Sequence, residues 1–192
     1  MEVTKDPITD ITAEQFAKHF SALAKQFHSP DIIGQILQNM QIEEIPAGTR
    51  LIEYEGACST LYLVWSGLLL ASIEEQGVKI TLGEVGPGEW IGEVTLIEPG
   101  PASASITCIE DSTLLSMSHE GFQKLRENYP AAAGALMHTL SLNLADRLRT
   151  YGNRAAEEIY DREYLMKDLP PEKRTSIITI LARLMGIRGG KS

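Results

Sequence analysis

Between residues 41 and 118 the sequence repeats one pattern, a short run rich in Val, Ile, Leu and Tyr followed by a turn. The runs read RLIEYEG, TLYLVWSG, LLLASIEEQG, VKITLGEVGPG, SASITCIE and STLLSMS, and most of the turns contain glycine. Several short strands at close and regular spacing are typical of an antiparallel barrel or sandwich. This segment therefore predicts a mainly β fold, and the chain on either side of it predicts flanking helices.

The segment before the strands, residues 11–40, predicts helix. Thr12 and Gln15 have the spacing of a capping box, in which each side chain binds the other residue's backbone N–H. One apolar stripe at helical spacing follows, made of Phe16, Phe20, Leu23, Ala24 and Phe27. Ser29 and Pro30 break the helix. A shorter stripe then contains Ile33, Ile36, Leu37 and Met40.

Helix also returns after the strands. Ser118 is a predicted N-cap for a short helix that ends at Pro130, and a long helix is predicted from there to Asp161 or beyond. Its apolar stripe contains Leu136, Leu140, Leu144, Leu148, Tyr151, Ala155 and Ile159. A stripe of this length is more than one small barrel covers, so it predicts a homodimer seam. A break follows at Asp168, then an amphipathic helix over residues 172–187 and a disordered tail.

These patterns divide the chain into four expected parts: an N-terminal helical segment (1–40), a β barrel (41–128), a long dimerisation helix (129–163) and a C-terminal helix with its tail (164–192). Residues 1–144 contain 7 basic and 19 acidic side chains, whereas residues 145–192 contain 10 basic and 7 acidic ones. The acidic body argues against a broad nucleic-acid surface, which needs a basic patch.

Several function classes are excluded or disfavoured. No run of eighteen apolar residues predicts a membrane span, and the polar, acidic N-terminus is not that of a signal or transit peptide. Cys58 and Cys108 are isolated, which predicts two buried thiols in a reducing cytoplasm. No histidine lies between His28 and His119, so a histidine-ligated metal centre in the barrel is excluded. No hydrolase, P-loop or zinc-protease motif is present, so the chain is not expected to be an enzyme.

Four stretches resemble the cyclic nucleotide-binding domain family, to which catabolite activator protein and the regulatory subunits of protein kinase A belong. They read IPAGTRLIEYEGACSTLYLVWSG, LGEVGPGEWIGE, GEVTLIEPGPASASI and LADRLR, and they lie between residues 45 and 149. The resemblance implies an antiparallel double-stranded β-helix, or jelly-roll, with a long C-terminal dimer helix. It also implies that residues 92–106 form the phosphate-binding cassette, with cAMP or cGMP as candidate ligands and no cofactor or metal.

The cassette has a chemical interpretation of its own. A short helix beginning at Gly92 points free N–H groups at its open end, which favours an anion such as a cyclic phosphate. Glycine allows a close approach of the backbone. The resemblance implies that Gly92, Glu93 and Val94 contact the ligand, and that Glu93 accepts hydrogen bonds from the ribose. An alternative role for Glu93 is that of a helix-terminal carboxylate satisfied by backbone N–H groups.

The sequence departs from the family where the phosphate is expected to bind. Family members carry an arginine after the cassette proline, but here Pro101 is followed by Ala102. Ser103 keeps the position at which bacterial members often carry a phosphate-contacting serine, and Arg147 on the long helix is a candidate replacement for the missing cation. Losing an arginine contact is expected to weaken binding by about two decades.

A second departure concerns the DNA-reading module of the family's transcription factors. Such a module needs several helices and a hairpin, whereas only 24 residues follow Asp168, so direct DNA binding is not expected. Two hypotheses follow. The first is a stand-alone cytoplasmic regulatory sensor that binds a cyclic nucleotide weakly, or another small anion, and signals through its helices to a protein partner. The second is a degenerate dimeric interaction module that binds no ligand.

Overall fold

The computed structural model describes residues 5–7, 11–75, 78–97 and 100–162, and the side chains of residues 11–74, 79–97 and 100–150. The chain forms two compact units, residues 1–140 and residues 141–192. The predicted helix over residues 172–187 and the predicted tail lie outside the described residues.

The N-terminal segment is helical, as predicted, but it forms three short helices. They are α1 (Ala13–His19), α2 (Ser21–Gln26) and α3 (Pro30–Leu37). Thr12 and Gln15 make the predicted capping box, and Ser29 caps α3. The single helix predicted before Ser29 is wrong, because Phe20 leaves helical geometry with φ −121° and ψ 63°.

The strands form two antiparallel sheets, and they confirm the predicted mainly β fold with flanking helices. The five-stranded sheet has the order β1 (Lys5–Pro7), β2 (Gln41–Ile45), β9 (Ser112–Ser118), β4 (Thr60–Ser66) and β7 (Trp90–Ile91). The four-stranded sheet has the order β3 (Arg50–Ile52), β8 (Ser105–Cys108), β5 (Leu69–Glu75) and β6 (Val78–Val85). No pairing closes these described strands into one barrel, and β1, which pairs with β2, was not predicted.

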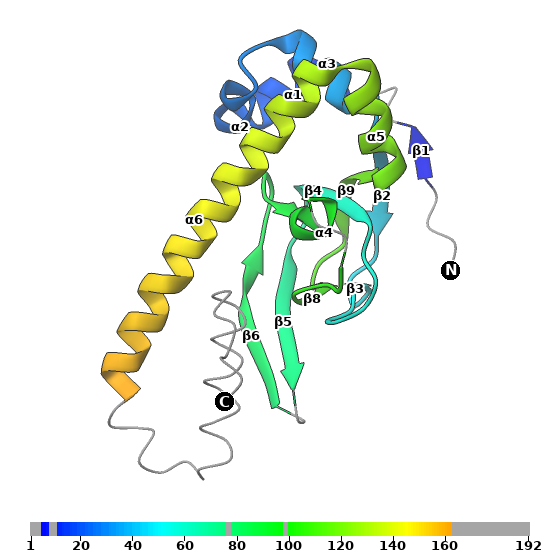
Figure 1. Ribbon diagram of the computed structural model, residues 1–192. Coiled ribbons are helices and arrows are strands. Elements are labelled where there is room, and N and C mark those ends of the chain that lie inside the picture. The colour runs from blue at the N-terminus through cyan, green and yellow to red at the C-terminus, as the bar shows by residue number, and fades with distance from the viewer. Residues whose placement is uncertain (1–4, 8–10, 76–77, 98–99, 163–192) are drawn as a thin grey trace. The chain divides into compact units, whose positions relative to one another are not determined.

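Side chains of the five-stranded sheet alternate between two cores. On β4, Leu61 and Leu63 face the helices, whereas Tyr62 and Val64 face the space between the sheets. The helical core contains Phe16, Phe27 and Leu115, and Figure 1 shows α1, α2, α3 and α5 gathered at one end of the strands. The inter-sheet core contains mostly aliphatic side chains, contributed by both sheets: Ile45, Ile52, Leu69, Ala71, Val85, Ile106, Cys108 and Leu114.

Two helices follow the strands, α5 (His119–Asn128) and α6 (Pro130–Arg162). Ser118 accepts a hydrogen bond from the Gly121 backbone N–H, which confirms the predicted cap. One part of the predicted dimer seam is wrong: Leu136 and Leu140 are fully buried in the helical core, so they do not belong to an exposed stripe. The predicted thiols are both free, but only Cys108 is buried and Cys58 is half-buried.

Candidate functional site

The cassette, residues 92–106, begins at a glycine that no other residue replaces without strain. Gly92 has a φ of +81°, and a Cβ added there would overlap the carbonyl oxygen of Thr60. The Gly92 carbonyl accepts hydrogen bonds from the Leu96 N–H at 3.2 Å and from the Thr95 hydroxyl at 3.1 Å. The start of the cassette therefore rests directly on the backbone of β4.

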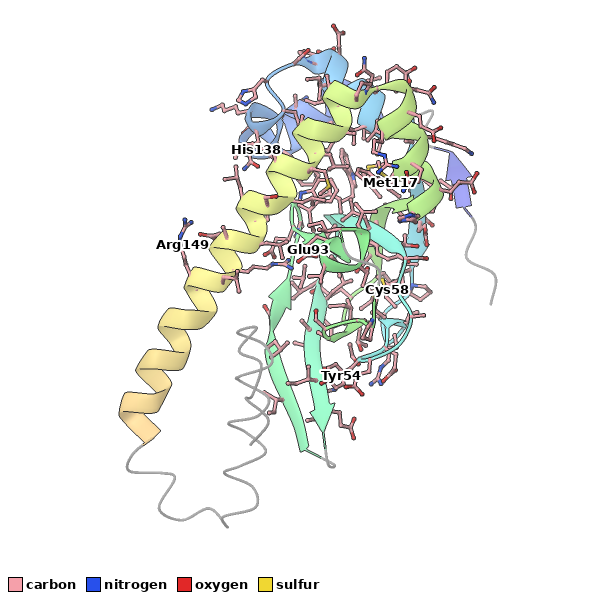
Figure 2. The ribbon with its side chains drawn as sticks, in the orientation of Figure 1. Tyr54, Cys58, Glu93, Met117, His138 and Arg149 are labelled. Atoms are coloured by element: carbon pink, nitrogen blue, oxygen red, sulfur yellow. The ribbon has the colours of Figure 1, made fainter. Side chains whose placement is uncertain are left out.

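The two residues after Gly92 begin the short cassette helix α4 (Glu93–Ile97) and face opposite environments. The Glu93 side chain is 5% exposed, whereas Val94 is 41% exposed. Burying a carboxylate is unfavourable unless polar partners compensate for its lost hydration. Figure 2 labels Glu93 at the short helix α4. The predicted ribose-binding carboxylate thus lies inside the fold, and Val94 lies toward the solvent.

The end of the cassette is held by the turn between β3 and β4. The Ala102 N–H donates to the Gly56 carbonyl, and the Ala102 carbonyl accepts from the Glu55 N–H, both at 2.9 Å. Pro101 pairs with Ala57 in an isolated antiparallel bridge. The end of the cassette is therefore hydrogen-bonded to residues 54–57, and its start lies close to Thr60 of the same segment.

The next contact along the cassette is made by a side chain. The Ser105 hydroxyl accepts a hydrogen bond from the Tyr54 N–H at 2.9 Å, and Ser105 is buried. Ser103, the serine predicted to contact a phosphate, is exposed. The alternating small residues of the sequence thus have two roles, since one fixes the turn and the other faces outward.

Ala102 points its side chain toward the space between the two sheets. It is 6% exposed and belongs to the inter-sheet core with Ile52, Tyr62 and Ile106. A longer side chain at this position would start from the interior of the domain, not from its surface. Arg147, the predicted replacement cation, is half-buried on α6 in the second unit, whereas the other five predicted site residues lie in the first.

A pocket adjoins the same segment, and the sequence did not predict it. It has a volume of about 500 Å³, and its walls come from residues 50–53, from residues 56–60 and from Tyr62. Arg50 lines it, and one guanidinium nitrogen (Nη1) contacts both carboxylate oxygens of Glu53 at 2.9 Å. A signal was available, because Arg50 is the single Lys or Arg between Lys25 and Lys79.

Tyr62, one of the residues that line this pocket, has a neutral phenol. Burial, helped by the nearby Glu43 carboxylate, raises the pKa of Tyr62 to about 12. The hydroxyl therefore stays protonated at physiological pH and keeps its ability to donate a hydrogen bond.

No group of three or more His, Cys, Asp or Glu side chains that could hold a metal ion occurs among the described residues.

Two antiparallel sheets, with a glycine-initiated turn of small residues beside them, form the β domain of this chain. Residues 42–129 match the family model of the cyclic nucleotide-binding domain. This part of the chain is similar to that family, and its two sheets have the jelly-roll fold of the family's solved structures.

One curated protein and two solved structures are similar to this chain. The cyclic AMP receptor protein of Thermus thermophilus is 34% identical over 126 residues, which are 64% of this chain and 56% of that protein. The crystal structure of Thermus thermophilus catabolite activator protein is 27% identical with a TM-score of 0.60, and the match covers 84% of this chain and 79% of that one. The c-di-GMP-responsive global regulator CLP of Xanthomonas campestris is 25% identical with a TM-score of 0.63, over 75% of this chain and 74% of that one.

The matched segment is only part of the curated relative. The match spans little more than half the length of the curated Thermus thermophilus receptor protein. Within the described residues, no helix is both long enough and apolar enough to span a membrane.

Proposed function

We propose that this chain is a cytoplasmic regulatory sensor whose cassette binds a cyclic nucleotide weakly, or a related small anion, and that α6 transmits the bound state to a protein partner. The observation that carries the proposal is the geometry of the cassette. Gly92 rests on the Thr60 carbonyl, Glu93 is buried at the start of α4, and Ala102 faces the inter-sheet space. The proposed role is regulatory and not catalytic, and direct DNA binding is no part of it.

The range of ligands stays broad because the relatives differ. One relative is named for cyclic AMP and another for c-di-GMP. The second candidate function, a dimeric module that binds no ligand, is favoured by Ala102, because a methyl group supplies no charge for a phosphate.

Thermal unfolding separates the two functions. A ligand that binds only the folded state at tenfold its Kd stabilises it by about 1.4 kcal/mol, which corresponds to roughly 3–5 °C for a chain of this size. We expect cAMP, cGMP or c-di-GMP at millimolar concentration to raise the unfolding midpoint by this amount. Glu93→Gln is the matched variant, because it removes the carboxylate but keeps the shape of the side chain, and it should reduce the shift. No shift with any of the three nucleotides would favour the module that binds no ligand.

We also propose that the chain forms a homodimer along the distal part of α6. Leu144 and Leu148 are four residues apart, so they share one helix face, and Leu148 is 58% exposed. Leu136 and Leu140 do not contribute, because they are buried in the first unit. The seam therefore begins about one turn after Leu140.

Leu148→Glu is expected to weaken the dimer, because it places a charge in an apolar seam. Light scattering of the unmodified protein at micromolar concentration should give twice the 21.1 kDa chain mass, and the variant should approach a single chain mass. Leu142→Glu is the control, because Leu142 is 47% exposed but two residues away from Leu144, on another face. An unmodified protein that is monomeric, or equal effects of the two variants, would contradict the proposed seam.

A further inference from the structure

The pocket beside the cassette has the dimensions of a small-molecule site. Its volume of about 500 Å³ lies within the range of roughly 300–1,000 Å³ that is usual for such sites. Arg50 lines the pocket, and so do Ser59, Thr60 and Tyr62, each of which carries a hydroxyl group. A guanidinium with several hydroxyl donors is the chemistry that recognises an oxyanion such as a phosphate or a carboxylate.

The charges of the lining favour one position for an anion. Among the residues that line the pocket, Arg50 is the one basic side chain and Glu53 the one carboxylate. The Tyr62 phenol adds no charge, since burial raises its pKa to about 12. The Arg50 and Glu53 side chains are 43% and 60% exposed, so solvent screens their ion pair and an incoming anion has access to the guanidinium.

We propose that this pocket is a second ligand site, in which Arg50 binds the phosphate or carboxylate group of a small metabolite. The Glu53 carboxylate occupies the guanidinium when the site is empty, and the ligand's oxyanion replaces it. The cation of this site, Arg50, lies in the first unit and lines the pocket itself. The cassette differs, because Ala102 supplies no charge and the candidate cation Arg147 lies in the second unit.

The site also adjoins the cassette through its own wall. Gly56 lines the pocket and its carbonyl accepts the Ala102 N–H, while Thr60 lines the pocket and its carbonyl lies close to Gly92. A ligand held at Arg50 would therefore lie beside the segment that both ends of the cassette approach. Any effect of the two sites on each other must be reciprocal in their binding free energies.

The test is a titration of the full chain with inorganic phosphate, followed by nuclear magnetic resonance of the Arg50 side-chain N–H and of the amides of residues 56–60. Ionic strength is held constant with sodium chloride, since screening alone changes exposed ion pairs. We expect saturable shifts with a millimolar Kd. Arg50→Ala should weaken binding at least tenfold, whereas Arg50→Lys should retain part of it because the charge remains. Lys124→Ala is the matched control, because Lys124 is an exposed, ion-paired cation on α5 that does not line the pocket, and it should leave phosphate binding unchanged.

Glu53→Gln tests the proposed competition, because a carboxylate that competes with the ligand predicts the direction in which phosphate affinity changes. If Glu53 competes with the anion, removing its charge should tighten phosphate binding, by up to about fivefold for an exposed pair. Three outcomes would each overturn the proposal. Arg50→Ala could leave phosphate binding unchanged, or Glu53→Gln could weaken it. The third is that residues 56–60 show no saturable shift up to 20 mM phosphate, a concentration of roughly tenfold a millimolar Kd. Intact folding of the variants is checked by the amide spectrum of the two sheets.

Discussion

Replacing Gly92 with alanine is expected to lower the free energy of unfolding by about 3 kcal/mol or more. Two costs combine: a non-glycine residue at a φ of +81° is strained by about 1–2 kcal/mol, and the new Cβ overlaps the Thr60 carbonyl oxygen. Either the cassette or β4 has to move. The measurement is thermal or urea unfolding, and the midpoint temperature should fall by roughly 6–12 °C.

Gly48→Ala is the matched control for the backbone strain. Gly48 has a φ of +82°, almost the same as that of Gly92, but a Cβ added there meets no atom within 4 Å. Its substitution should therefore cost only the strain of about 1–2 kcal/mol. The difference between the two variants measures the close approach of the cassette to Thr60. Equal losses at the two glycines would show that this approach contributes nothing to stability.

The fold class was predictable because it depends on local patterns repeated many times. Six apolar runs with turns between them specify antiparallel strands whichever strands pair, and Thr12 and Ser118 cap helices with their own side chains. Pairing order was not predictable, because it depends on contacts far apart in the sequence. For example, β4 pairs with β9, and the edge strand β1 of three residues has no periodicity to reveal it.

Helical periodicity also failed to predict burial where one apolar stripe runs from a buried part of a helix into an exposed part. Leu136, Leu140, Leu144 and Leu148 form one continuous stripe in the sequence. In the structure the first two are fully buried against the helical core, whereas Leu148 is exposed. The spacing of a stripe identifies which residues share a helix face, but it does not say what covers that face. The same limit applies to Phe20, whose position in a regular stripe hid the break between α1 and α2.

The candidate site, too, could be predicted only in part from the sequence. The cassette was predicted from the family resemblance, which rests on its glycine and on the small residues that follow its proline. Its attachment to residues 54–60 was not predicted, since hydrogen bonds such as that from the Glu55 N–H to the Ala102 carbonyl join backbone groups and leave no trace in residue types. Glu55 itself adopts a φ of +60°, a conformation that the sequence would assign to the neighbouring Gly56.

Ala102→Arg is expected to create or tighten cAMP binding by at least about tenfold, the size of one charge-assisted hydrogen bond. The structure supplies the reason, because Ala102 is 6% exposed and directs its side chain toward the inter-sheet space. An arginine there would begin in the interior of the domain, between the apolar cluster and the cassette. Titration calorimetry on the unmodified protein and on the variant measures the change in Kd.

The same substitution should make stability depend on the nucleotide. Without ligand, a guanidinium that starts beside Ile52 and Ile106 is poorly hydrated, so the unfolding midpoint of Ala102→Arg should fall below that of the unmodified protein. Bound phosphate compensates this charge, and millimolar cAMP should restore the midpoint. Ala102→Met is the control, since it adds comparable length without charge and should gain no affinity. Adding Glu93→Ala to Ala102→Arg should reverse part of the gain by removing the carboxylate proposed to bind the ribose.

An Ala102→Arg protein that is folded but gives no binding heat at millimolar cAMP would mean that the cassette does not admit a nucleotide. The module that binds no ligand would then be the better description. Tight binding by the unmodified protein would mean that another cation already meets the phosphate, and Arg147→Ala would then test the first candidate.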